Sequence, residues 1–227
     1  MTAVVGSGIM AVNLSPGDVG LQLLQNSIAT MLALAVLILI LGPVSGAHFN
    51  PVVTLADWWL HRRDANHLSL PEAVAYVGAQ VSGAISGAIL ANLMFGLRAV
   101  SWSTTTRTTP HLWIGETVAT SGLILLIFVL VRTHRTQYAP AAVGAYIGAA
   151  YWFTSSTSFA NPAVTIGRVF TDTFAGISPA SILGFIAFQV VGAVIGLLLV
   201  GVLYPQRQTV SGDTAAIEPA TERAAAS

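Results

Sequence analysis

Two asparagines are the side chains of this sequence best suited to handle a polar solute, because each lies in apolar surroundings and precedes a proline. The triplets are Asn50-Pro51-Val52 and, 111 positions later, Asn161-Pro162-Ala163. Asparagine is a preferred N-cap and proline fits the first helical position, so each triplet predicts an abrupt helix start. The asparagine oxygen can cap that helix while its NH₂ group donates two hydrogen bonds toward a solute, which aspartate could not do.

The composition is that of a membrane protein. Of the 227 residues, 54% are hydrophobic and only 8% are charged, whereas about a quarter of the residues in a soluble domain are charged. The formal net charge of zero argues against a nucleic-acid partner. The chain has no cysteine, which excludes a disulfide, a thiolate nucleophile and a thiolate metal site.

Five predominantly apolar stretches are candidates for membrane-spanning helices, and a span needs roughly 20 such residues. We expect these helices at 19–41, 71–96, 111–131, 140–153 and 180–204. The Gly42-Pro43 pair is expected to end the first of them.

The helices that begin at the two triplets are too short to cross the bilayer. We expect them at 51–60 and about 162–172, where ten residues span roughly 15 Å of a hydrocarbon core of ~30 Å. If they enter from opposite faces, their positive N-terminal ends meet near the midplane. Irregular backbone is tolerated there only where it is buried or lines a water-filled cavity, so the triplets predict a pore. Neutral polar solutes pass such a pore, whereas cations and protons meet the positive ends.

The segments before the triplets are expected to supply two ladders of backbone carbonyl acceptors along this pore. The contributing residues are Gly46, Ala47, His48 and Phe49 in the first segment and Thr157, Ser158, Phe159 and Ala160 in the second.

A second pattern repeats between the two halves of the chain. Gln80-x-x-Gly83-x-x-x-Gly87 matches Gln189-x-x-Gly192-x-x-x-Gly196. Glycines four apart allow close helix packing in lipid and are common in membrane helices, but here both copies carry the same glutamine and follow an Asn-Pro pair.

These repeats predict an all-α membrane protein in which three transmembrane helices and one re-entrant half-helix occur twice. Three is odd, so the second repeat is inverted relative to the first. We expect one channel domain over 1–204, with repeats at 1–96 and 111–204, and a disordered cytoplasmic tail over 205–227. The apolar segment 1–14 is short for a span and is expected to be the last part of a helix, because of a late start site or a shortened chain. A genuine short or re-entrant segment is the alternative.

Arginines accumulate on the cytoplasmic side of membrane proteins, which predicts the orientation. If the first span runs outward, both termini lie in the cytoplasm of a multi-pass plasma-membrane protein. The arginines then placed inside are Arg62, Arg63, Arg132, Arg135, Arg207 and Arg223, whereas Arg98, Arg107 and Arg168 fall outside.

The two Asn-Pro boxes, the phrase Ser45-Gly46-Ala47-His48-Phe49-Asn50-Pro51, the paired glutamines and Glu116 resemble the major intrinsic protein family of aquaporins and aquaglyceroporins, over about residues 1–204. The resemblance implies a passive channel with six tilted helices and two half-helices per subunit, a pore in each subunit, and usually a homotetramer in the bilayer. It also implies a glutamate in the first helix equivalent to Glu116, which this chain lacks.

The chain departs from the family at the narrow filter, where an arginine usually follows the second box directly. Val164 occupies that position, and Arg168, one turn further, is not assumed to replace the arginine. Spacing assigns the other filter positions to Thr30, Ala149 and Ser158. This set is small and has neither an aromatic nor a cationic side chain, so we expect a wider opening without a fixed external positive charge. It would admit glycerol, urea and undissociated metalloid acids such as arsenous or boric acid, in addition to water.

Three further groups of polar residues could take part in proton transfer, metal binding or catalysis, but structural roles explain them better. Glu116, together with Gln80 and Gln189, is expected to brace the half-helix loops by hydrogen bonding rather than to relay protons. His48 has no second metal ligand spaced near it, so we expect a pore-wall or structural histidine, no metal site and no cofactor. The hydroxyls of Ser155 to Ser158 have no paired base, so we expect no enzyme activity.

Two alternatives to a channel remain. A secondary transporter also uses inverted repeats and broken helices, but its intramembrane charge pairs are largely absent here. A non-conducting family member is the other alternative, because an incomplete first helix could prevent folding.

Overall fold

The computed structural model describes residues 1–63 and 67–205, and every regular element in these ranges is helical. All but the first residue of the predicted tail therefore lies outside the described part. The α-helices are α1 (Thr2–Leu14), α2 (Val19–Ser45), α3 (Pro51–His61), α4 (Leu70–Met94), α5 (Pro110–Arg132), α6 (Ala139–Phe153), α7 (Pro162–Gly167) and α8 (Ile182–Leu203). Short 3₁₀ helices are η1 (Thr136–Tyr138), η2 (Arg168–Phe170) and η3 (Pro179–Ser181).

Four of the described helical segments are long and apolar enough to cross a membrane: α2, α4, α5 and the segment Pro179–Leu203 that contains α8. Their outward side chains are apolar; Leu183 of α8, for example, is 82% exposed. Such a surface suits lipid contact rather than water. The helices α1 and α6 are shorter, with 13 and 15 residues, and α6 follows directly on η1.

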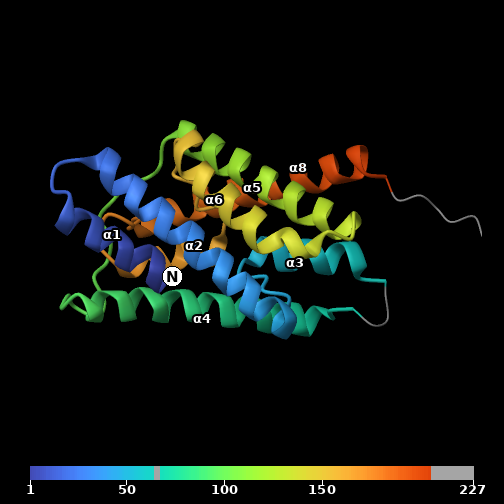
Figure 1. The fold of residues 1–227 in the computed structure, drawn as a ribbon, viewed down its shortest axis with the longest axis horizontal. Helices are drawn as coiled ribbons and strands as arrows, with labels where there is room; N and C mark the ends of the chain where they lie inside the picture. Colours follow the sequence, from blue (N-terminus) through green and yellow to red (C-terminus); the bar gives the residue numbers. More distant parts are fainter. Residues whose placement is uncertain (64–66, 206–227) are drawn as a thin grey trace, which may run out of the picture.

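The elements α1 to α4 correspond in order to α5 to α8, as expected for two repeats. Helix α1 packs on α4 as α5 packs on α8, and α2 packs on α6 to join the two halves. Figure 1 shows the result, a bundle of long helices around the half-helices, with α1 alongside one end of α4.

The repeated glycines explain how closely α8 approaches α5. A Cβ atom on Gly192 would lie 2.6 Å from the Thr117 carbonyl oxygen, and one on Gly196 would lie 2.7 Å from the Ser121 carbonyl oxygen. In the other repeat, a Cβ on Gly87 would lie 2.8 Å from Met1 Cβ, whereas nothing lies within 4 Å of one on Gly83. The α1–α4 contact is therefore close at Gly87 and absent one turn earlier.

Two predicted helix ends are wrong. Helix α2 continues through Pro43 to Ser45 and ends at Gly46, which has the left-handed φ of 71°. Proline is tolerated inside membrane helices because neighbouring groups satisfy the freed carbonyl, so Gly42-Pro43 was a weaker stop than the following glycine. Helix α7 ends at Gly167 rather than near 172, because the chain tightens into the 3₁₀ turn η2, as helix ends often do.

Candidate functional site

Each Asn-Pro box begins a half-helix, and the asparagine caps it. Asn50 Oδ1 accepts a hydrogen bond from Val52 N at 3.1 Å, and Asn161 Oδ1 accepts one from Ala163 N at 2.9 Å. Pro51 and Pro162 occupy the first helical positions of α3 and α7. The two positive helix ends are thereby fixed at the sites of the asparagines.

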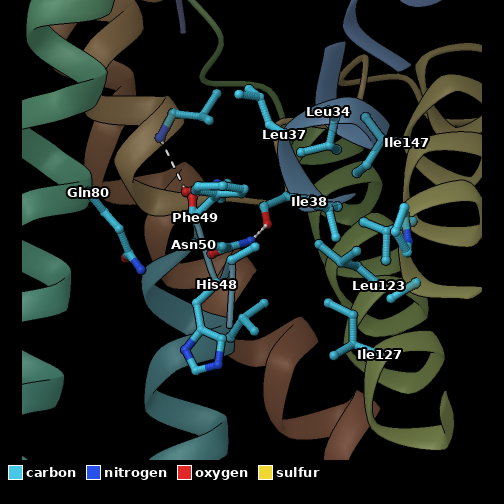
Figure 2. A pocket seen from close by; sticks show the side chains of 18 of the residues that line it. Leu34, Leu37, Ile38, His48, Phe49, Asn50, Gln80, Leu123, Ile127 and Ile147 are labelled. Atoms are coloured by element: carbon cyan, nitrogen blue, oxygen red, sulfur yellow. Dashed lines mark hydrogen bonds between the residues drawn. The ribbon is translucent and has the colours of Figure 1, made fainter. Parts of the chain in front are cut away.

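The two asparagines also tie the repeats together. Asn50 Nδ2 donates to the Ala160 carbonyl oxygen at 2.7 Å, and Asn161 Nδ2 donates to the Phe49 carbonyl oxygen at 2.8 Å. Figure 2 shows the amide of Asn50 beside Phe49. An amide NH₂ group has two hydrogens, so only one per asparagine remains for a solute. The prediction that both face the lumen is therefore wrong, because it overlooked the acceptors of the opposite loop.

The two loops before the boxes share one unusual backbone conformation. Positive φ angles occur at three matching positions in each loop, and 111 residues separate the members of each pair. The angles are 71°, 49° and 42° at Gly46, Ala47 and Phe49, and 61°, 50° and 47° at Thr157, Ser158 and Ala160. A left-handed non-glycine residue costs about 1–3 kcal/mol and persists only where the surroundings enforce it. The symmetry of the repeats therefore extends to their backbone.

A buried network holds the second loop. Glu116 of α5 is 0% exposed; its Oε1 accepts from Phe159 N at 2.9 Å and its Oε2 from Ala160 N at 2.8 Å. Gln189 of α8 donates from Nε2 to Glu116 Oε2 at 2.6 Å and to Thr165 Oγ1 at 2.9 Å. These contacts connect α5, the loop, α7 and α8.

The first repeat contains only part of this network. Gln80 Nε2 donates to Thr54 Oγ1 at 2.8 Å, which matches the contact of Gln189 with Thr165. The sequence of α1 contains no acid that could correspond to Glu116.

A cavity of about 990 Å³ runs along both loops. One wall is polar, with the asparagines and the loop backbones, and the opposite wall is aliphatic. Figure 2 shows this aliphatic wall facing His48, Phe49 and Asn50, with Gln80 to one side. Its labelled residues are Leu34, Leu37, Ile38, Leu123, Ile127 and Ile147. The residues predicted to supply carbonyls all line this cavity except Thr157, which lines a smaller neighbouring cavity of about 220 Å³.

Three of the four predicted filter residues, Thr30, Ser158 and Val164, line the large cavity, whereas Ala149 does not. Ala149 lies on the exposed side of α6. Two residues along a helix correspond to a rotation of roughly 200°, so Tyr151 faces the opposite way. Its neighbour Tyr151 is 3% exposed, lines the cavity, and donates from its hydroxyl to Thr30 Oγ1 at 3.3 Å.

Arg168 brings a cation to this end of the cavity. The side chain is 2% exposed; its Nη2 donates to the Tyr151 hydroxyl at 3.2 Å, and its Cζ lies 3.9 Å from the centroid of the Phe159 ring. The expectation of an opening without aromatic or cationic side chains is therefore wrong. The direction of the Arg168 side chain explains the difference. Long side chains on a helix point back toward the helix N-terminus, so Arg168 can reach the level of Val164.

A second guanidinium lies nearby on the loop between α4 and α5. Arg107 Cζ is 5.2 Å from the Phe159 centroid, and its Nε donates to the Gly176 carbonyl oxygen at 3.3 Å. Burial, and then the charge of Arg168, lower the pKa of Arg107 to about 10. Arg107 is still protonated at neutral pH. It lines the smaller cavity of about 220 Å³, whereas Arg168 lines both cavities.

The opposite mouth carries an acid and several histidines. His48 and Asp57 line the cavity there, and His48 Nε2 lies 4.0 Å from Asp57 Oδ2. His67 Nδ1 faces the same carboxylate oxygen as His48, and His61 Nδ1 faces the other oxygen. The prediction that His48 has no potential metal ligand near it is therefore wrong, because α3 carries Asp57 to within 4.0 Å of the loop that contains His48.

Comparison with known proteins agrees with this arrangement. The family model described as major intrinsic protein matches residues 1–160. Aquaglyceroporin AqpS of Rhizobium meliloti (strain 1021) is 50% identical over 202 residues, which cover 88% of this chain and 82% of that protein. Aquaporin-6 of Rattus norvegicus is 31% identical over 209 residues, which cover 84% and 69% of the two chains. The probable aquaporin AqpM of Archaeoglobus fulgidus is 31% identical over 187 residues, which cover 78% and 73%. The chain thus belongs to the major intrinsic protein family of membrane channels.

Proposed function

We propose that this passive channel conducts neutral solutes bulkier than water, namely glycerol, urea and undissociated metalloid acids such as arsenous acid, together with water. The observation that carries the proposal is the structure around Val164. This short apolar side chain lines the cavity at the first turn of α7. The guanidinium of Arg168 lies against Phe159 and Tyr151, which hold it by a ring contact and a hydrogen bond.

The two unlike walls of the cavity favour solutes that have both hydroxyl groups and an apolar side. Hydroxyls can bond to the free amide hydrogens of Asn50 and Asn161 and to loop carbonyls, while carbon atoms contact the aliphatic wall of Leu34, Ile38 and Ile147. Cations meet the two helix N-termini as well as Arg168, which lines the cavity, so a neutral solute is favoured. The similarity to a protein named aquaglyceroporin supports the same solute class.

We also assign one filter and one brace to this channel. The filter comprises Thr30, Tyr151, Ser158 and Val164, with Arg168 at its edge. The brace comprises Glu116 and Gln189 in the second repeat and Gln80 in the first. We further propose a homotetramer in the plasma membrane with cytoplasmic termini. The arginine distribution supports this orientation. Arg132 at the end of α5 donates to the carbonyls of Val200 and Tyr204, so the ends of α5 and α8 lie on the same side.

The test is a substitution at Val164. Val164→Arg should obstruct the opening and add a second cation beside Arg168, so that glycerol and arsenous acid flux falls strongly while water flux falls less. Both fluxes are measured by stopped-flow light scattering in proteoliposomes. Val164→Thr, which has nearly the same shape, is the matched control and should conduct as the original chain does. Unchanged glycerol flux in Val164→Arg would show that Val164 does not lie in the narrow part.

A further inference from the structure

Three side chains that commonly bind metal ions meet at the end of α3, and we call Asp57, His61 and His67 the Asp/His cluster. Asp57 and His61 are one turn apart on the same face of the helix. His67 returns from the following loop and stacks on His61, with ring centroids 4.2 Å apart and planes 15° apart. One ligand atom from each of the three residues lies within 4.8 Å of the others.

The distances within the cluster suit one small ion. His61 Nδ1 lies 3.3 Å from Asp57 Oδ1, and His67 Nδ1 lies 3.6 Å from Asp57 Oδ2. Ligand atoms around a tetrahedral ion, each bound at about 2.0–2.1 Å, are roughly 3.4 Å apart. The two histidine nitrogens face different oxygens of Asp57, and the ligand atoms lie within 4.8 Å of one another, so the three side chains must move closer together to share an ion.

The hydrogen bonds of His67 distinguish this cluster from a simple ion pair. Leu68 N donates to His67 Nδ1 at 3.0 Å, so this nitrogen carries a lone pair rather than a proton. The same nitrogen faces the Asp57 carboxylate, which is also an acceptor. Two acceptors that face each other repel unless a cation lies between them. Two stacked imidazoles also repel when both are protonated, and neutral imidazole is the form that binds metals.

We propose that the Asp/His cluster binds one divalent transition-metal ion, with Zn²⁺ as the best match, and that the bound ion slows solute flux. Two nitrogens and one carboxylate oxygen suit Zn²⁺ and its neighbours, whereas Mg²⁺ and Ca²⁺ prefer oxygen ligands alone. To bind, His61 uses the tautomer that leaves Nδ1 unprotonated and gives up its contact with the Asp57 carbonyl oxygen. His67 gives up its bond from Leu68.

The link to flux is Asp57, which belongs both to the cluster and to the cavity wall. His48 Nε2 lies 4.0 Å from Asp57 Oδ2, the oxygen that His67 also faces, and His48 is two residues before Asn50. It is within reach as a fourth ligand after a small shift. An ion held here adds a divalent charge at the mouth and restrains the loop that carries the first Asn-Pro box.

The experiment uses the full chain without a histidine tag. Zinc binding is measured by isothermal titration calorimetry in detergent, and glycerol flux is measured in proteoliposomes with Zn²⁺ on both sides. The test variant is His61→Asn with His67→Asn, neither of which lines the cavity. The matched control is His134→Asn, which removes an exposed histidine at the end of α5.

We expect one Zn²⁺ per chain and reduced glycerol flux in the original chain and in the control. The double variant should have normal flux without zinc, bind zinc more than about tenfold more weakly, and lose the inhibition. No zinc binding by the original chain, or equal binding by the double variant, would overturn the site. Binding lost in the double variant without any effect of zinc on flux would overturn the link to the pore. The binding arm does not depend on which solute the channel conducts.

Discussion

Glu116 offers a stringent test of how the second half-helix loop is held. Its carboxylate is fully buried and accepts from Phe159 N, Ala160 N and Gln189 Nε2 at 2.9, 2.8 and 2.6 Å. Glu116→Gln keeps one oxygen but turns an NH₂ group toward the backbone donors, so one or two buried donors lose their acceptor. Each such loss costs about 1–3 kcal/mol, and we expect a decrease of about 2–4 kcal/mol in the free energy of unfolding. Glu116→Ala leaves all three donors unsatisfied and should cost more.

The assay is SDS-induced unfolding in mixed micelles, followed by tryptophan fluorescence, together with glycerol flux in proteoliposomes. Glu72→Gln is the control, because Glu72 also accepts two hydrogen bonds from Ser69 but is exposed, so its replacement should change stability little. Unchanged stability of Glu116→Gln would refute the brace. Unchanged stability combined with loss of a flux driven by a proton gradient would instead favour proton relay.

Three further predictions concern helix packing and the charged mouth. Gly196→Ala should destabilise the protein by about 1–3 kcal/mol, because the new Cβ would lie 2.7 Å from a carbonyl oxygen of α5. Gly201→Ala is the control and should leave stability unchanged, because its Cβ would have nothing within 4 Å. The same SDS titration compares the two variants. Arg168→Met should widen the mouth and raise urea flux relative to water flux, and an unchanged ratio would remove Arg168 from the filter. The pKa of Arg107, which lines the smaller cavity beside Arg168, is lowered only to about 10, so its charge is constant between pH 6 and 8. Its contribution to the exclusion of Na⁺ should not change over that range, and a Na⁺ leak that grows toward pH 8 would contradict this.

Much of the architecture is predictable because it depends on local chemistry. An Asn-Pro pair specifies a helix start wherever it occurs, and both Asn50 and Asn161 cap their helices. The glycines that follow Gln189 could be placed at a helix contact from their spacing alone. A single acid in an apolar helix had to find buried donors, and Glu116 finds them in the loop before the second box.

The errors occurred where function depends on direction rather than on position in the sequence. Spacing from the boxes assigns Ala149 to the filter, but the rotation of α6 turns Tyr151 to the cavity instead. The position of Arg168, one turn beyond Val164, does not predict a place in the filter, but its side chain extends back to Tyr151 and Phe159. The contacts of the asparagine amides with Phe49 and Ala160, and the meeting of His67 with Asp57, join segments that only the folded chain brings together.

The most direct test of the central claim is glycerol flux through the purified protein in proteoliposomes, measured by stopped-flow light scattering over a wide range of glycerol gradients. A passive pore for small neutral solutes predicts flux far above that of empty vesicles, proportional to the gradient and unaffected by a protonophore or by removal of sodium. Flux that saturates and requires a proton or sodium gradient, or no flux above that of empty vesicles, would contradict it.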